Sequence, residues 1–298
     1  MLATPVIRTR GLTKYYGGFE AVKDLSLTVE RGSITGFLGQ NGAGKSSTLK
    51  MLLGIMKPSA GGGEVLGHDI ADPAASVEMR RRTAYVAEDK RLYDYMTVRQ
   101  IIRFTRAFYP GWRGDLEASL LDDFRLPLDR PIGKLSKGMR TQTALLLAFC
   151  RGSELLILDE PTEGLDPVVT ERVLQLTVAA AADGATIFFS SHQISEVEQV
   201  ADRVLIIDRG RLVLDTTTDA VKEEFRRIRI VCDAPEVIDL TGLGGVVDAR
   251  HEGRAFSVIA SQGIAAIAAR LEAATGERAE VLPVTLKEVL LERVGPGR

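Results

Sequence analysis

The segment GQNGAGKS at residues 39–46 has the residue types and spacing of a phosphate-binding loop, G-x-x-x-x-G-K-S. Gly42 and Gly44 allow the backbone to curl, so that successive N–H groups point at one anion. Lys45 supplies a mobile cation to the outer phosphates, and the Ser46 hydroxyl can reach Mg²⁺. The candidate phosphate ligands are Gly39, Asn41, Gly42, Ala43, Gly44, Lys45, Ser46 and Ser47.

Two carboxylates follow a second apolar run, LLIL at residues 155–158. Asp159 would orient Mg²⁺, directly or through water, and Glu160 would accept a proton from a water that attacks the γ-phosphate. Taken alone, the run fits equally well a strand that ends in a solvated acidic turn. Together with the phosphate loop it predicts hydrolysis of a nucleoside triphosphate.

The elements that must position these residues alternate in type along the first part of the chain. The apolar run at 33–38 predicts a buried strand before the phosphate loop, and apolar residues at helical spacing predict a helix over 46–56 that Pro58 ends. Further strands are expected at 155–158, 186–190 and 204–207. Buried strands that alternate with helices predict an α/β fold with a mainly parallel sheet.

Two segments depart from this alternation. Residues 96–150 read as a helical insertion, with Thr97 as a cap. After residue 222 we expect a small α+β domain, with strands at 227–231, 246–250 and 255–260 and a turn at 251–254. Helices are expected around 264–271 and over 285–294. The predicted domains are therefore 1–222 and 223–298.

Composition excludes several classes of protein. The 298 residues carry a formal net charge of −2, which gives no electrostatic reason to expect a nucleic-acid partner. No run approaches the roughly 18 to 20 apolar residues of a membrane helix, and the N-terminus lacks the pattern of a signal peptide. Cys150 and Cys232 fit buried thiols in a reducing compartment rather than a disulfide framework.

Three further segments narrow the class of nucleotide enzyme. LSKGM occupies residues 135–139, GLD residues 164–166, and Ser191-His192 follows a predicted strand. In this order, with the phosphate loop and the acidic strand, they resemble the ATP-binding subunits of ABC transporters over about residues 5–222. The resemblance implies a P-loop ABC ATPase domain with an antiparallel β part and a helical insertion, binding ATP and Mg²⁺.

The same resemblance implies a head-to-tail dimer, homomeric or heteromeric, with ATP between the subunits. Ser136 and Gly138 would then contact the γ-phosphate bound by the other subunit, and the helix after them would point its positive end at it. His192 would help to hold the attacking water. Tyr16 would stack on adenine, with Tyr15 as the adjacent alternative, and Asp166 would communicate between the two sites.

One residue departs from the family pattern. In AYVAED at residues 84–89, Glu88 stands where the family usually has Gln. A charged carboxylate is a stronger metal ligand than an amide carbonyl, but it repels phosphate. Our hypothesis is that Glu88 keeps the role of contacting the metal and linking it to the insertion.

The resemblance also implies a separate transmembrane permease, and hence a peripheral place at the cytoplasmic face of the membrane. The expected docking face is the insertion from about 88 to 134, where Phe104, Phe108, Tyr109 and Trp112 serve either docking or the insertion's own core. LSKGM and the short C-terminal domain are similar to bacterial export ATPases of the antibiotic-efflux or cell-envelope stress group.

Two alternative functions fit the sequence less well. ABC proteins that act on ribosomes usually have two ATPase halves and those that act on DNA have long coiled coils, but this chain has one phosphate loop and no long heptad stretch. A small-molecule kinase of another P-loop class would not need LSKGM or the late histidine.

Overall fold

The computed structural model describes residues 5–231, 240 and 242–288. They form two compact units, one up to Asp215 and one from Thr216 onward. Among the described residues, none of the helices is both long and apolar enough to cross a bilayer.

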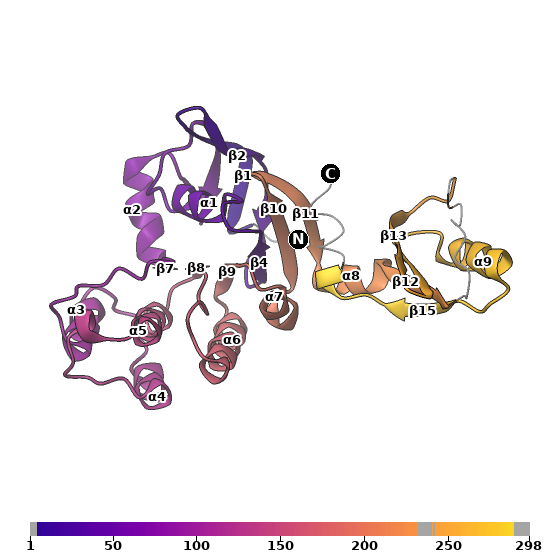
Figure 1. The fold of residues 1–298 in the computed structure, drawn as a ribbon. Helices are drawn as coiled ribbons and strands as arrows, with labels where there is room; N and C mark the ends of the chain where they lie inside the picture. The colour runs from indigo at the N-terminus through magenta and orange to yellow at the C-terminus, as the bar shows by residue number, and fades with distance from the viewer. Residues whose placement is uncertain (1–4, 232–239, 241, 289–298) are drawn as a thin grey trace. The chain divides into compact units, whose positions relative to one another are not determined.

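A six-stranded sheet forms the centre of the first unit, in the order β11-β10-β4-β9-β8-β7 (Figure 1). The neighbours from β10 to β7 pair in parallel, and β4, β8 and β9 are buried along their whole length. Burial on both faces explains why these strands read as continuous apolar runs. Their bounds are β4 (Ile34–Leu38), β7 (Thr83–Val86), β8 (Leu155–Asp159), β9 (Thr186–Ser191), β10 (Arg203–Asp208) and β11 (Arg211–Thr217).

An antiparallel sheet accompanies the parallel one, in the order β2-β1-β5-β6 with β3 paired to β1. Strand β1 ends at Tyr16, and a tight hairpin returns the chain at Phe19. The sheet thereby carries two aromatic residues toward the phosphate loop. Its bounds are β1 (Ile7–Tyr16), β2 (Phe19–Leu25), β3 (Thr28–Val29), β5 (Ala60–Val65) and β6 (His68–Asp69).

The helix after the phosphate loop is shorter than the sequence predicted. It ends at Leu52, so the predicted extent to Met56, with Pro58 as the residue that ends the helix, was wrong. The chain turns instead at Gly54, whose φ is +62° and whose missing Cβ would lie 2.8 Å from the Cβ of Ser76, so that glycine alone fits without strain. The helices that flank the central sheet are α1 (Lys45–Leu52), α2 (Pro73–Arg82), α6 (Pro167–Ala182) and α7 (Ile194–Val200).

The block predicted to be helical is a group of helices beside the sheets (Figure 1). Thr97 caps the first helix in a complete capping box with Gln100, which confirms the predicted cap. The last helix is buried from Thr141 onward because it packs between the other helices of the insertion and β7. The elements are α3 (Val98–Arg106), α4 (Gly114–Phe124), the 3₁₀ turn η1 (Ile132–Lys134) and α5 (Lys137–Phe149).

The second unit is an antiparallel sheet in the order β13-β14-β12-β15, with Ile267 and Leu271 of α9 in its core. The predicted turn at 251–254 was too long, because β13 continues to Glu252 and pairs His251 with Phe256. Cys232 and the predicted helix beyond residue 288 lie outside the described residues. The elements are α8 (Thr218–Glu224), β12 (Arg226–Val231), β13 (Val246–Glu252), β14 (Ala255–Ala260), α9 (Ile264–Thr275) and β15 (Glu280–Pro283).

Gly36 in β4 provides a test of this packing. A Cβ at this position would lie 2.3 Å from Cγ1 of Val197 in α7, so we expect Gly36→Ala to lower the free energy of unfolding by about 1–3 kcal/mol. Urea unfolding followed by the fluorescence of Trp112, the one tryptophan of the chain, measures this in the first unit.

Gly62→Ala is the matched control, because a Cβ at Gly62 in β5 meets no atom within 4 Å. Val197→Ala should restore part of the loss in the Gly36→Ala background. Equal unfolding midpoints for the two glycine variants would contradict the packing argument.

Candidate active site

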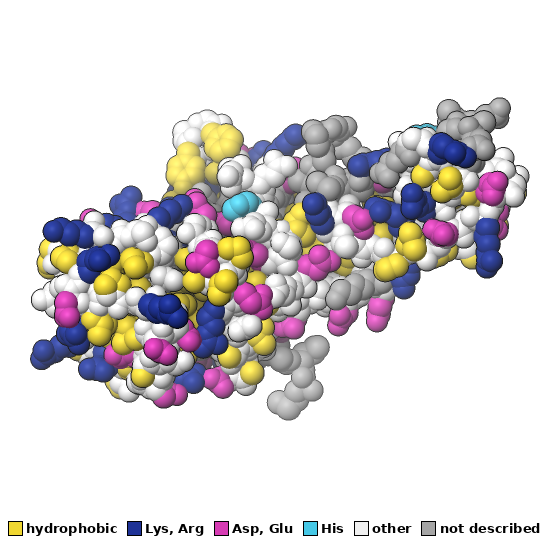
Figure 2. Space-filling model, turned by 60° about the horizontal axis from the view of Figure 1, so that its bottom comes forward, with side chains coloured by type: hydrophobic (Ala, Val, Ile, Leu, Met, Phe, Trp, Pro, Cys, Tyr) yellow, Lys and Arg dark blue, Asp and Glu magenta, His cyan; other side chains and the backbone are white. Residues whose placement is uncertain are grey.

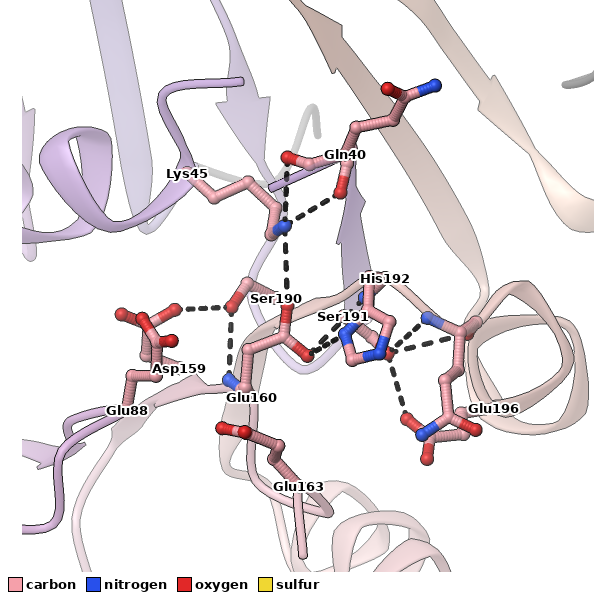
Figure 3. Close-up of polar contacts among 12 residues, drawn as sticks. Gln40, Lys45, Glu88, Asp159, Glu160, Glu163, Ser190, Ser191, His192 and Glu196 are labelled. Carbon is pink, nitrogen blue, oxygen red and sulfur yellow. Dashed lines mark hydrogen bonds and ion pairs between the residues drawn. The ribbon is translucent and has the colours of Figure 1, made fainter. Parts of the chain in front are cut away.

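The chemically active residues of the sequence meet at one edge of the central sheet. The phosphate loop follows β4, Glu88 follows β7, and His192 follows β9, while Asp159 ends β8 and Glu160 comes directly after it. Because these four strands run in parallel, their carboxyl ends share an edge, which is where open α/β sheets bind ligands. Figure 3 shows Lys45, Glu160 and His192 converging there.

The phosphate loop has the backbone conformation that its glycines predict. Gly42 and Gly44 have φ values of +82° and +108°. A Cβ at Gly44 would lie 2.5 Å from the carbonyl oxygen of Ala21, whereas one at Gly42 would meet no atom within 4 Å and so would occupy open space. Helix α1 begins at Lys45, directly after the loop, so its positive end adds to the N–H groups that an anion would meet.

Lys45 contacts both the phosphate loop and the Glu160 carboxylate. Its Nζ donates to the carbonyl oxygens of Gly39 at 2.7 Å and Gln40 at 3.4 Å. The same ammonium lies 3.3 Å from Glu160 Oε1, and both side chains are buried. The pair therefore joins the end of β4 to the end of β8 by a charge contact that is shielded from water.

Glu160 occupies a strained backbone position. Its φ is +47°, in the left-handed region that non-glycine residues rarely adopt, at a cost of order 1–3 kcal/mol. Its Oε2 lies 2.8 Å from Nδ1 of His192 and accepts from the His192 N–H at 3.4 Å. The carboxylate is thus held between a lysine and a histidine, in the arrangement of a positioned general base.

Ser190 joins the two carboxylate residues. Its hydroxyl donates to Asp159 Oδ1 at 2.6 Å and accepts from the Glu160 N–H at 3.1 Å. Sequence reasoning did not select it. The signal in the sequence was that Ser190 lies two residues before His192, near the end of the strand that His192 follows.

The turn that carries His192 is fixed by a buried carboxylate that the sequence did not reveal. Ser191 donates to Glu196 Oε2 at 2.9 Å and accepts from the Gln193 N–H at 2.9 Å. Glu196 is buried in the first turns of α7. This network holds the chain directly after His192, so it fixes where the imidazole can point (Figure 3).

A cavity of about 310 Å³ opens over the phosphate loop and is bordered by Glu88 and Glu160. Tyr16 lines it, with its hydroxyl 3.2 Å from Ser47 Oγ, while Tyr15 is not among the lining residues. Phe19 lines the cavity too and is 64% exposed. Sequence reasoning missed Phe19 because it starts the strand after a glycine turn and has no motif of its own.

The oxygen donors present fit a magnesium ion. Ser46 Oγ donates to Glu88 Oε2 at 3.4 Å, and these two residues and Asp159 line a second cavity of about 440 Å³. Within the described residues there is no group of three His, Cys, Asp or Glu side chains with metal-binding geometry. A hydroxyl with one or two carboxylates suits Mg²⁺, which completes its shell with phosphates and water.

The other residues predicted for the site lie apart from it. Ser136 caps α5 by accepting from the Met139 N–H at 3.2 Å, and Asp166 caps α6 through the N–H groups of Val168 and Val169. Neither Ser136, Gly138 nor Asp166 is among the residues that line the two cavities. The structure therefore brings together the phosphate loop, both carboxylates, Glu88, His192 and Tyr16. Of the LSKGM segment only Lys137 lines a cavity, and no residue of the GLD segment does.

Tyr85 and Glu163, which line the second cavity, have shifted pKa values. Burial, reinforced by the negative charge of Asp159, raises the pKa of Tyr85, so that its phenol stays protonated. The hydrogen bond from Lys137, at 2.7 Å, lowers the pKa of Glu163. The loop after Glu160 is thereby tied by an ion pair to the first turn of α5.

Comparison with known proteins shows which family of proteins this chain resembles. The family model described as ABC transporter matches residues 22–163. The chain is 36% identical to the bacitracin transport ATP-binding protein of Bacillus licheniformis, covering 74% of this chain and 73% of that protein. It is 35% identical to the daunorubicin/doxorubicin resistance ATP-binding protein of Streptomyces peucetius, covering 74% and 68%.

Solved structures agree with the sequence comparisons. The ATP-binding subunit of an ABC transporter is 30% identical, with a TM-score of 0.67 over 73% of this chain and 92% of that one. A bacterial ABC transporter cassette solved as a dimer shares the fold at 21% identity, with a TM-score of 0.64 over 71% and 98%. On the family match, the relatives and the assembled site, the chain belongs to the family of ABC transporter ATP-binding proteins.

Proposed function

We propose that this chain hydrolyses ATP to ADP and phosphate and thereby powers export through a separate membrane permease. The observation that carries the proposal is the buried Glu160 carboxylate, held between Lys45 and His192 at the border of the phosphate-loop cavity. Residues 1–222 are proposed as the ATPase domain and residues 223–298 as an accessory domain.

Each residue has a role that its contacts support. Glu160 accepts the proton of the attacking water, and His192, hydrogen-bonded to it, orients that water and the γ-phosphate. Lys45 and the phosphate-loop N–H groups bind the phosphates, and Tyr16 stacks on the base. Ser46, Glu88 and Asp159 would hold Mg²⁺, which when bound offsets the charge that develops on the phosphates.

A second subunit completes the site in this proposal. Ser136 is exposed at the N-terminus of α5, where the helix presents its positive end, yet neither cavity of its own subunit includes it. A head-to-tail partner could therefore present Ser136 and Gly138 to the γ-phosphate, with Asp166 at the contact. Closure would then depend on ATP, because the nucleotide supplies the anion between the two surfaces.

The permease is proposed to dock on the helical insertion, at the cytoplasmic face of the membrane. Phe104 and Phe108 are 42% and 64% exposed and stack edge to face with centroids 5.1 Å apart. Tyr93 and Tyr95 extend this exposed aromatic cluster. Figure 2 looks onto this side, where hydrophobic side chains lie among basic ones.

Tyr109 and Trp112, the other two aromatic residues predicted for docking, make contacts within their own chain. The ring of Tyr109 stacks on the Arg151 guanidinium at 3.9 Å, and Trp112 Nε1 donates to Glu117 at 2.6 Å.

Export is proposed because the relatives named above are ATP-binding proteins of bacitracin transport and of drug resistance. These relatives favour transport over an ABC protein that acts on ribosomes or DNA.

Glu160→Gln tests the catalytic role. The amide keeps the shape but cannot take the proton, so we expect kcat for ATP to fall by about 10²–10⁴-fold while MgATP still binds. Size-exclusion chromatography should show an ATP-dependent dimer that persists in this variant. Turnover equal to that of the unaltered chain would contradict the proposal; a missing dimer calls for the same experiment with the permease present.

Glu88→Ala tests whether Glu88, which stands where the family usually has Gln, contacts the metal and links it to the insertion. Removing the carboxylate beside Ser46 should raise the Mg²⁺ concentration needed for half-maximal ATP hydrolysis and reduce the stimulation by the permease. Glu88→Gln, which restores the usual family residue, is the conservative comparison and should keep most of the turnover. An unchanged Mg²⁺ dependence and stimulation in Glu88→Ala would refute the role.

The aromatic cluster can be tested with the double variant Phe104→Ala/Phe108→Ala. The loss of two exposed rings should weaken co-purification with the membrane partner at least several-fold, since buried aromatic anchors dominate interface energies. Ile55→Ala, at a residue 58% exposed but remote from α3, is the matched control. Equal recovery of the partner with both variants would place the interface elsewhere.

A further inference from the structure

Buried charge is confined to one place among the residues whose burial the structure describes. The charged side chains in the buried class are Lys45, Lys90, Asp159, Glu160 and Glu196. The proposed chemistry uses three of them, and Glu196 holds the turn after β9. Lys90 has no role in that chemistry, although burying an ammonium is costly unless it is well bonded.

Lys90 bonds the backbone of the catalytic turn. Its Nζ donates to the carbonyl oxygen of Glu160 at 2.8 Å and to that of Asp159 at 3.4 Å. The side chain is 5% exposed, and burial lowers its pKa against the opposing influence of nearby carboxylates. Both acceptors are main-chain atoms, so this lysine constrains the backbone conformation of the turn.

The turn that Lys90 bonds is the strained one. Glu160 has a φ of +47°, and a residue in that region stays there only when its surroundings impose the conformation. Ser190 bonds the Glu160 N–H at 3.1 Å, and Lys90 bonds the carbonyl of the same residue at 2.8 Å. The peptide groups on both sides of the Glu160 Cα are therefore fixed, one by β9 and one by the loop after β7.

We infer that Lys90 is a positioning residue for hydrolysis, whose ammonium holds the Asp159 and Glu160 carbonyls and so keeps the Glu160 carboxylate between Lys45 and His192. The inference rests on the proposed function, in which Glu160 is the base. Charge-assisted hydrogen bonds are strong enough for this task, and here water does not compete with them.

The position of Lys90 also connects the base to the helical insertion. Lys90 lies two residues after Glu88, on the loop that leads from β7 into the insertion, and Glu88 contacts Ser46 on α1 at 3.4 Å. One short loop thus contacts both the phosphate-loop helix and the catalytic turn. A permease that shifts the insertion would move the base through Lys90.

The test is steady-state ATP hydrolysis by the full chain. Lys90→Met keeps the length of the side chain but removes the donor. We expect kcat to fall about tenfold or more while KM for ATP changes less than about threefold, because the phosphate loop and Tyr16 are untouched. Lys90→Arg should regain part of kcat, since it keeps a cation that donates.

Lys57→Met is the matched control, because Lys57 is exposed and lines neither of the two cavities. It should turn over ATP like the unaltered chain. An unchanged kcat in Lys90→Met, or a rise in KM with kcat intact, would overturn the inference. If Lys90→Met does not fold, Lys90→Gln replaces it. The glutamine amide can still donate a hydrogen bond, so kcat should fall by less than in Lys90→Met. An unaltered kcat in Lys90→Gln would then overturn the inference.

A double variant separates this inference from the proposed function. If Lys90 acts through Glu160, Lys90→Met should lower the residual rate of Glu160→Gln by less than about twofold. If Lys90→Met lowered the rate by the same factor in the unaltered chain and in Glu160→Gln, Lys90 would act independently of Glu160. Full turnover in Glu160→Gln would refute the proposed base itself, whereas an inactive Glu160→Gln with a normal Lys90→Met would refute only the role of Lys90.

Discussion

The structure of the first unit depends on burying opposite charges together at one sheet edge. Lys45 and Lys90 face Asp159 and Glu160 where water cannot solvate them, and each charge is tolerated only because a partner or a hydrogen bond compensates it. Parallel strands make this possible, because their carboxyl ends deliver loops from distant parts of the sequence to one line. The fully buried strands β4 and β9 contain no charged residue of their own.

The local part of this arrangement is readable from the sequence. A phosphate loop needs glycines with positive φ, a lysine and a hydroxyl at fixed spacing, and all lie within one strand-loop-helix segment whose conformation the residues dictate. Asp159 and Glu160 are equally local, since they follow a buried strand. The cap at Thr97 could be predicted for the same reason.

The contacts that could not be predicted depend on the order of strands. Ser190 reaches Asp159 because β9 pairs with β8, and Lys90 reaches Glu160 because β7 lies on the other side of β8. Alternation of strands and helices predicts a parallel sheet but not which strands are neighbours. The end of α1 was missed for a related reason. The helix ends at Leu52, and the chain then turns at Gly54, where Ser76 on another helix leaves no room for a side chain.

The strained backbone at Glu160 has a consequence for coupling. A carboxylate on a relaxed turn would keep its place whatever its neighbours did, but φ of +47° must be imposed from outside. The imposing contacts come from α1, from the loops after β7 and β9, and from Ser190. Movement of any of these elements would change the position of Glu160, the proposed base. In the proposed mechanism, a site built this way makes hydrolysis depend on the state of the surrounding loops, one of which leads directly into the helical insertion.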